Sequence, residues 1–208
     1  MLYDISPPAG GSLAVWPGDT PLSREVLLDI ARGHNITLST LRATVHLGAH
    51  ADAPSHYGAG APDIASVPVE RYIGPCEVMR VAVERGGLVT GAMLPRPVSA
   101  PRLLLATGSY PDPGVFNDDF AALAPELVDH LSAAGVSLVG VDTPSLDPFA
   151  SKNLPAHHRC LARDMMILEG LALRDVPEGR YELIALPLRL VGFDASPVRA
   201  VLRSSQSP

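Results

Sequence analysis

Short runs of apolar and β-branched residues recur along the chain without a sustained helical spacing, which predicts strands. The segments with this pattern are residues 24–30, 35–45, 76–83, 102–107, 136–141, 181–186 and 198–202. The first two segments are expected to pair, with Gly33 in their connection. Residues 102–107 and 136–141 are apolar enough that we expect both faces of these strands to be buried.

Helical spacing of apolar positions is clearest over residues 125–134. Pro125 suits a first helical turn, and Gly135 supplies a stop after the last one. A shorter helix is expected over residues 155–164 and a helical turn over 68–72. Together these elements predict an α/β fold with a substantial β component.

Composition favours a single domain. A chain of 208 residues with 47% apolar side chains suits one continuous core, so we expect one domain over residues 1–203 and a polar tail over 204–208. Many prolines and glycines argue against a helical bundle. The net charge of -6 offers no basic surface for nucleic acid, and neither a signal peptide nor a membrane span is visible. We expect a cytoplasmic protein without nucleic-acid or membrane partners.

The two cysteines, Cys76 and Cys160, lie far apart in the sequence and would stay reduced in the cytosol. We expect two small, buried apolar residues. A nucleophilic Cys/His/Asp system is an alternative, but the histidines have a better explanation.

Three of the seven histidines fall within residues 46–56, together with an aspartate. On a straight strand His46 and His50 would stand about 13 Å apart, too far to share an ion. A helix is disfavoured by Gly48 and by the proline that follows the segment. A strand that turns sharply at Gly48 would fold His50 and Asp52 back toward His46.

Two imidazoles and one carboxylate suit zinc or a similar divalent ion and leave coordination positions open for water, as catalysis requires. Asp52 has two oxygens and is able to bridge a second ion. The candidates for further ligands are His157, His158 and Glu169. Taken alone, the two histidines fit a polar helix surface equally well, and Glu169 fits a solvated turn.

The sequence resembles a known family at this point. The segment His46-Leu47-Gly48-Ala49-His50-Ala51-Asp52-Ala53-Pro54-Ser55-His56 is similar to the His-x-Gly-Thr-His-x-Asp-x-Pro-x-His signature of the cyclase-like metal-dependent hydrolases, with alanine in place of threonine. Further similar segments are Asp4-Ile5-Ser6, Val15-Trp16-Pro17-Gly18-Asp19-Thr20, Phe116-Asn117, Gly140-Val141-Asp142-Thr143-Pro144-Ser145, and His157 followed by Glu169. Within the family, the chain is most similar to the bacterial kynurenine formamidases (arylformamidases).

The resemblance implies a swivelling β/β/α fold with a mixed, partly barrel-like β core and a few flanking helices. It also implies a homodimer with two metal ions per subunit, usually Zn²⁺, with Mn²⁺ or Co²⁺ as alternatives. By analogy the first ion takes His46, His50 and the bridging Asp52. The second ion takes His157 and the bridging Glu169. His157 is preferred over His158 because its spacing from Glu169 along the sequence matches the family pattern.

The same resemblance makes His56 the catalytic proton carrier and Trp16 a substrate-binding aromatic. The expected reaction is hydrolysis of the linear amide N-formyl-L-kynurenine to L-kynurenine and formate, in tryptophan degradation through the kynurenine pathway. The chemistry is sound, because a divalent ion lowers the pKa of its water toward about 7 and a histidine changes charge near neutral pH. Asp142, at the expected end of a strand, either orients a metal ligand or forms an ordinary strand-end turn.

Two other functions remain as alternatives, and a third is excluded. Another amide or lactam hydrolase of the same family would use the same motif. A serine formamidase is excluded by the absence of a Gly-x-Ser-x-Gly segment. A non-catalytic metal-binding protein would need a closed coordination shell, against which His56 and Trp16 argue.

Overall fold

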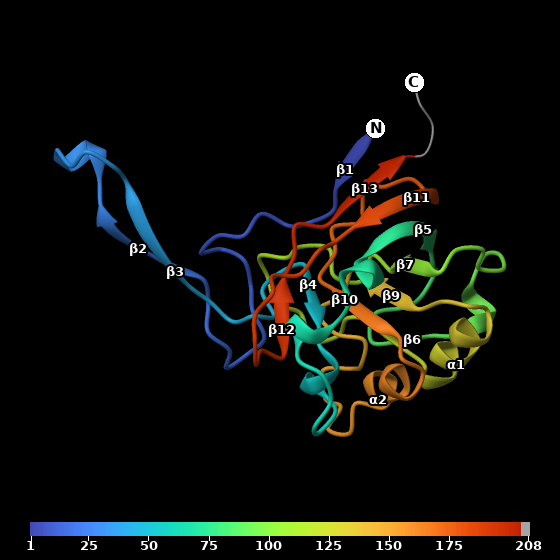
Figure 1. Ribbon diagram of the computed structural model, residues 1–208. Coiled ribbons are helices and arrows are strands. Elements are labelled where there is room, and N and C mark those ends of the chain that lie inside the picture. The colour runs from blue at the N-terminus through green and yellow to red at the C-terminus, as the bar shows by residue number, and fades with distance from the viewer. Residues whose placement is uncertain (205–208) are drawn as a thin grey trace.

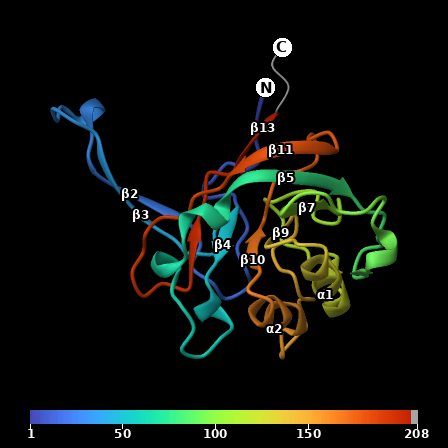
Figure 2. The same cartoon turned by 45° about the vertical axis from the view of Figure 1, so that its right-hand side comes forward.

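The computed structural model describes residues 1–204 and contains a nine-stranded sheet with two helices beside it (Figure 1). In the order of their pairing, the strands are β1 (Leu2–Asp4), β13 (Val201–Ser204), β11 (Gly179–Ile184), β5 (Ile73–Arg80), β7 (Arg102–Ala106), β9 (Leu138–Val141), β10 (Met166–Glu169), β4 (His50–Asp52) and β12 (Ala195–Pro197). The central strands β5, β7, β9 and β10 run parallel, and the strands on either side pair antiparallel. The sheet curls, so the expected α/β fold with a mixed, partly barrel-like core is confirmed (Figure 2).

The two segments expected to be buried on both faces are adjacent central strands. Every residue of β7 and of β9 is buried. One face of the sheet packs against the helices, and the other closes over a second apolar cluster that includes Tyr72 and Leu183. Because both faces are covered, alternation of apolar and polar residues is absent from these strands.

The helices α1 (Pro125–Ala133) and α2 (Pro155–Ala162) lie together over one face of the sheet (Figure 2). Both expected helices are confirmed, and each ends one or two residues earlier than the pattern predicted. Gly135 follows α1 with a φ of 86°, a left-handed conformation that glycine adopts without steric strain. The expected helical turn near residue 70 is the 3-10 turn Val69–Tyr72.

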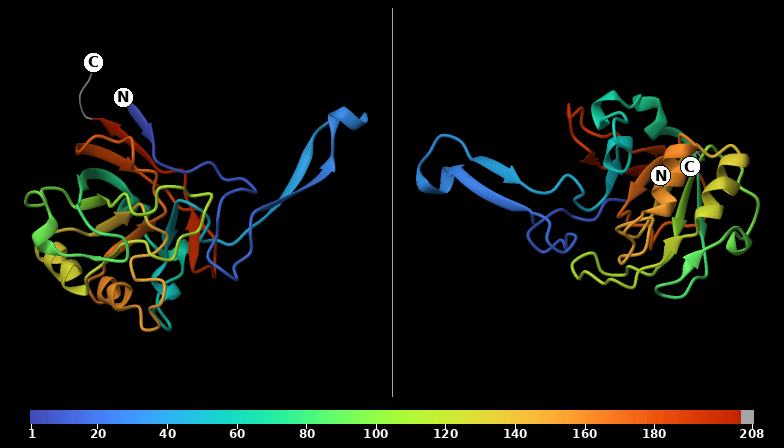
Figure 3. Two further views of the ribbon diagram at one scale, coloured as in Figure 1. Left: turned by 180° about the vertical axis from the view of Figure 1, so that it is seen from behind. Right: turned by 90° about the horizontal axis from the view of Figure 1, so that it is seen from below.

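Strands β2 (Ser23–Leu28) and β3 (Leu38–Arg42) pair as expected and form a hairpin that projects from the body of the protein (Figures 1 and 3). Both strands are shorter than predicted, because the 3-10 turn Ile30–Arg32, which ends at Gly33, occupies the tip. Every residue of β3 is exposed. The exposed apolar side chains of the hairpin are Leu27, Ile30, Ile36, Leu38 and Leu41.

The C-terminal segment differs from the expectation of one strand over residues 198–202. The chain forms β12 at one edge of the sheet and β13 near the other, and the residues between them cross from one to the other. Pro197 is tolerated because β12 is an edge strand, and the Val198 N–H after it still donates to the carbonyl oxygen of Ala49 at 2.9 Å. Ser204 is the last residue of β13, and the rest of the tail expected over 204–208 lies outside the described residues.

The strand expected over residues 76–83 begins earlier, as β5, because its antiparallel pairing with β11 extends back to Ile73. The apolar pattern missed six short strands: β1, β4, β10, β12 and the separate pair β6 (Leu88–Val89) and β8 (Ala122–Leu123). Each has at most four residues, too few for a periodicity to be recognised. Within residues 1–204, no helix combines the length and apolar character that a membrane span requires.

Candidate metal centre

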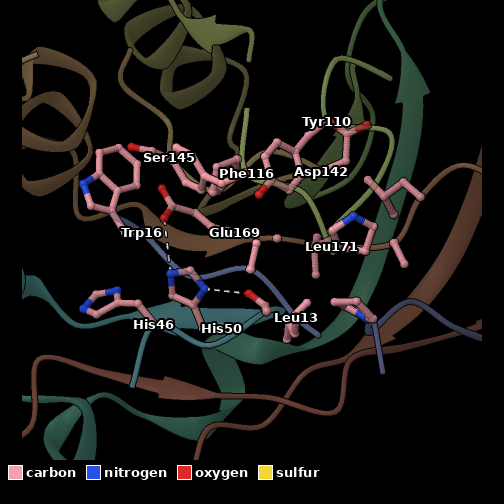
Figure 4. Close-up of a pocket in the computed structure, with 18 of the residues that line it drawn as sticks. Leu13, Trp16, His46, His50, Tyr110, Phe116, Asp142, Ser145, Glu169 and Leu171 are labelled. Atoms are coloured by element: carbon pink, nitrogen blue, oxygen red, sulfur yellow. Dashed lines mark hydrogen bonds and ion pairs between the residues drawn. The ribbon is translucent and has the colours of Figure 1, made fainter. Parts of the chain in front are cut away.

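Two neighbouring antiparallel strands bring three of the expected metal ligands together. His50, at the start of β4, lies opposite Glu169, at the end of β10, and Asp52 follows on the same face of the sheet. Nε2 of His50 lies 3.3 Å from Oε2 of Glu169 (Figure 4). The same nitrogen lies 3.4 Å from Oδ1 of Asp52, and all three side chains are buried. Strand pairing therefore builds one half of the cluster.

A turn at Gly48 brings His46 to the same cluster, as the spacing predicted. Gly48 has a φ of 55°, and Nδ1 of His46 lies 3.1 Å from Oδ1 of Asp52. The strand expected to continue to residue 45 ends at Arg42, because its partner strand β2 begins at Ser23, directly opposite. The turn at Gly48 is therefore preceded by a loop and not by a strand.

Helix α2 supplies the remaining expected ligand, His157. Its Nε2 lies 3.5 Å from Oδ2 of Asp52 and 3.3 Å from Oε1 of Glu169, whereas His158 is exposed. The structure therefore brings the first histidine of the pair to the cluster. The sequence pattern gave no role to Asp147, which is buried and accepts hydrogen bonds from the backbone and from Nδ1 of His157. Asp147 lies eight residues before the proline that opens α2, too far away to be recognised from the sequence as a capping residue.

Each of the three histidines in the cluster (His46, His50 and His157) turns one ring nitrogen toward the carboxylates and the other toward an oxygen outside the cluster. The outer bonds join His50 Nδ1 to the Gly48 carbonyl oxygen (2.8 Å), His157 Nδ1 to Asp147 Oδ2 (2.6 Å) and His46 Nε2 to Asp194 Oδ2 (3.0 Å). Proteins orient metal-binding imidazoles in this way, because the outer hydrogen bond fixes both the ring and its tautomer.

The spacing of the inward-facing atoms also fits a metal. Neighbouring nitrogen and oxygen atoms of the cluster are 3.1–3.5 Å apart, and ligands at about 2.0–2.2 Å around a tetrahedral ion would be about 3.3–3.6 Å apart. Nε2 of His50 and both carboxylate oxygens of Asp52 are buried without a hydrogen-bond partner among residues 1–204. Burial of such atoms is costly unless a cation satisfies them. The residues present therefore fit a metal cofactor.

The charges of the cluster shift the pKa values of its members. Burial opposes the ionised form of Asp52, but the nearby rings of His157 and His46 outweigh it and hold its pKa well below the usual range. Burial also opposes a charge on His46, but the hydrogen bond and charge of Asp52 raise its pKa to about 9. The pKa of Glu169 is lowered in spite of burial and of the neighbouring Asp52, through the close contacts of its carboxylate with His157 and His50. The ionised carboxylates thus attract positive charge, and a bound cation competes with protons on the histidines.

His56 lies beside both halves of the cluster. Its ring centroid is 4.3 Å from that of His46 and 6.3 Å from that of His157, and about a third of its side chain (34%) is exposed. It also lies close enough to His46 and Asp52 to share an ion with them. Nδ1 of His56 lies 3.3 Å from Oδ2 of Asp194. No local pattern predicted Asp194, because it is 138 residues away in the sequence.

The cluster opens into a cavity of about 490 Å³, a volume within the range of small-molecule sites. Trp16 lines this cavity with Phe116, and their ring centroids are 5.5 Å apart at an angle of 77° (Figure 4). Phe149 packs against Trp16 at 4.9 Å. Trp16 therefore belongs to an aromatic wall, in a turn as expected, and nothing in the local sequence predicted Phe149 as a member of it.

Asp142 lies at the end of β9, as predicted, and its contacts are those of a strand-end residue. Its carboxylate accepts hydrogen bonds from the Thr107 backbone N–H (3.0 Å), the Thr107 hydroxyl (2.6 Å) and the Gly108 N–H (2.8 Å). These bonds tie the end of β7 to the end of β9 beneath the cavity.

The cysteines are buried and unpaired, as expected of small apolar residues. Burial raises the pKa of Cys76 and that of Cys160 to about 12. Neither thiol is therefore an activated nucleophile.

Comparisons with known proteins agree with this geometry. The family model described as "Putative cyclase" matches residues 3–148. A relative from Bordetella petrii named kynurenine formamidase is 47% identical over 204 residues, 97% of each chain. A solved structure of a potential metal-dependent hydrolase with cyclase activity superimposes with a TM-score of 0.83 at 27% identity, over 100% of this chain and 99% of the other. A predicted metal-dependent hydrolase from Bacillus stearothermophilus gives a TM-score of 0.81 at 28% identity, over 97% of each chain.

Proposed function

This chain belongs to the cyclase family, and on that premise we propose that it hydrolyses N-formyl-L-kynurenine to L-kynurenine and formate. The name and the 47% identity of the relative from Bordetella petrii support this substrate. The metal-dependent hydrolases among the structural relatives support the reaction type. The reaction would be a step of tryptophan degradation through the kynurenine pathway.

The observation that carries the proposal is the paired orientation of the histidines, each with one nitrogen facing the carboxylates and one bonded outward. We assign two zinc ions to the cluster, of which His46 and His50 would hold one and His157 the other. Asp52 and Glu169 would contribute to both sites, because the two oxygens of each carboxylate face different histidines. When bound, such ions supply Lewis acidity and a nucleophile derived from water near neutral pH.

The other residues of the site bind the substrate and move its proton. Trp16 and Phe116 offer flat apolar surfaces for the aryl ring, which would orient the formyl group toward the carboxylate cluster. His56, beside the cluster and on the cavity wall, would take a proton from the attacking water and deliver it to the departing amine nitrogen. Amine departure without that proton would be slow, because a strongly basic anilide would have to leave.

We also propose that two copies of the chain pair through the β2–β3 hairpin. A two-stranded hairpin is marginally stable by itself, and this one exposes five large apolar side chains away from the body. Further exposed apolar residues, Leu188, Val191 and Phe193, belong to the segment that precedes β12. Burial of each hairpin against the body of a second copy would remove both surfaces from water.

The first test is turnover before and after metal removal. The protein is stripped with a chelator, reloaded with zinc, manganese or cobalt, and assayed for release of L-kynurenine from N-formyl-L-kynurenine. A cyclic amide is assayed in parallel. Activity that persists without metal would overturn the mechanism. Activity restricted to the cyclic amide would favour a lactam hydrolase, and no activity on either would favour a metal-binding protein.

Neighbouring histidines provide matched variants for the site residues. His157→Ala is expected to lose one bound ion and its activity. His158→Ala should keep both ions and full activity, because His158 is exposed. His56→Ala is expected to keep its metal and lose most of its kcat. Loss of metal in that variant would make His56 a ligand instead of a proton carrier.

A further inference from the structure

Asp194 joins two of the histidines from outside the buried cluster. Its Oδ2 lies 3.0 Å from Nε2 of His46 and 3.3 Å from Nδ1 of His56. The Asp194 side chain is about half exposed (48%), in contrast to the buried carboxylates that face the metal-binding atoms. The role of Asp194 therefore depends on the two rings that it contacts.

The backbone holds Asp194 in a fixed position relative to the segment that carries His56. The Ala53 N–H donates to the carbonyl oxygen of Asp194 at 2.8 Å, directly before the 3-10 turn Pro54–His56. The next residue, Ala195, pairs with Asp52 across β12 and β4. Asp194 is thus attached to the strand that carries a metal ligand and to the turn that carries His56.

The two nitrogens of His56 have different surroundings. Nδ1 faces Asp194, so this nitrogen carries the hydrogen and donates it to the carboxylate. Among residues 1–204, no side chain or backbone group bonds Nε2, and His56 lies on the cavity wall. Nε2 is therefore the nitrogen available to a molecule in the cavity.

We propose that Asp194 is a positioning residue for His56, which fixes the Nδ1–H tautomer and turns Nε2 toward the substrate. The inference rests on the proposed function, in which His56 delivers a proton to the amine nitrogen. A proton carrier must come within about 2.6–3.2 Å of the atom that it protonates. A partly exposed ring on a short turn would sample other rotamers without an anchor. Because the same oxygen contacts His46, the proton carrier keeps its place relative to the metal centre.

The test compares two substitutions of Asp194, one of which is also made in a His56→Ala background, with a control substitution outside the site. With zinc in excess, so that a weaker hold on the His46 ring does not empty the site, Asp194→Ala is expected to lower kcat about 10- to 100-fold, with KM nearly unchanged. Asp194→Asn keeps an acceptor oxygen and should recover most of that loss. In a His56→Ala background, Asp194→Ala should cause no further loss of kcat, because both changes remove the same contribution. Glu182→Gln is the matched control, since Glu182 is a carboxylate of β11 that accepts from Arg203 at 2.7 Å and lies outside the site.

A second measurement does not depend on turnover. In ¹⁵N NMR spectra of the zinc-loaded protein, the ring of His56 should carry its hydrogen on Nδ1, and Asp194→Ala should give a mixture of both tautomers. Absence of turnover by the unaltered protein would reject the proposed function, and the NMR spectra would still decide the role of Asp194. Loss of metal in Asp194→Ala even with zinc in excess, additive losses in the double variant, or a hydrogen on Nε2 in the unaltered protein would each overturn the proposal.

Discussion

Replacement of Gly170 by alanine is expected to damage the metal centre more than the fold. Gly170 follows Glu169 and has a φ of +66°, and a Cβ added there would lie 2.2 Å from the carbonyl oxygen of Gly48. Real Cβ contacts keep at least 3.0 Å, so the two turns must separate by about 0.8 Å. Because one turn follows Glu169 and the other connects His46 to His50, the displacement separates ligands of the same site.

A control variant isolates this displacement from backbone strain. Gly135 also has a positive φ, +86°, but a Cβ there would meet no atom within 4 Å. Left-handed strain alone costs about 1–2 kcal/mol, which corresponds to a fall in Tm of about 2–8 °C for a chain of this size. Gly135→Ala should show only this loss. Gly170→Ala should show at least as much, with reduced metal content and a kcat about 100-fold lower, because a misplacement of about 1 Å has that effect on catalysis.

The assay consists of thermal unfolding, metal analysis and kcat for both variants after zinc loading. If Gly170→Ala matched Gly135→Ala in all three measurements, the contact between the two turns would not hold the ligands in place. The reasoning from the 2.2 Å approach would then be wrong.

Four other predictions follow from the same structure. Asp147→Ala removes the acceptor of His157 and of two helix N–H groups, so chemical unfolding should show a loss of about 1–3 kcal/mol, and metal analysis should show about one ion per chain. In chelator-treated protein, the charged form of His46 stabilises the fold; this contribution is complete below the usual pKa of 6.5 and is lost as pH rises through about 9. Thermal unfolding should show a loss of stability on the order of 3 kcal/mol, and stability that does not change with pH between these two values would contradict the prediction. Phe116→Ala removes one aromatic wall of the cavity, so KM should rise about tenfold with kcat nearly unchanged, and an unchanged KM would exclude ring contact with the substrate. Leu41→Asp places a charge on the exposed apolar face of the hairpin, so light scattering should report a monomer with unaltered circular dichroism, and a persistent dimer would locate the interface elsewhere.

Local chemistry in the sequence was enough to predict one half of the metal centre. His46, His50 and Asp52 lie within seven residues, so the reach of the chain and the freedom of Gly48 to turn limit the arrangements that bring them together. The long apolar runs that became β7 and β9 were also predictable, because strands buried on both faces need apolar residues at nearly every position. The helix α1 was marked by its proline, its apolar stripe and its glycine.

The tertiary structure decided the contacts between distant segments. Periodicity reports whether a segment is buried, but it does not report which other segment buries it, so the pairing of β4 with β10 was not predictable. That pairing places Glu169 opposite His50, and the position of α2 over the sheet buries His157 while His158 remains exposed. Asp194 is the clearest case, because its contacts with His46 and His56 depend on β12 returning to pair with β4 at the end of the chain. The residue types alone therefore determined the kind of chemistry, whereas the packing of remote strands determined which side chains orient the groups that perform it.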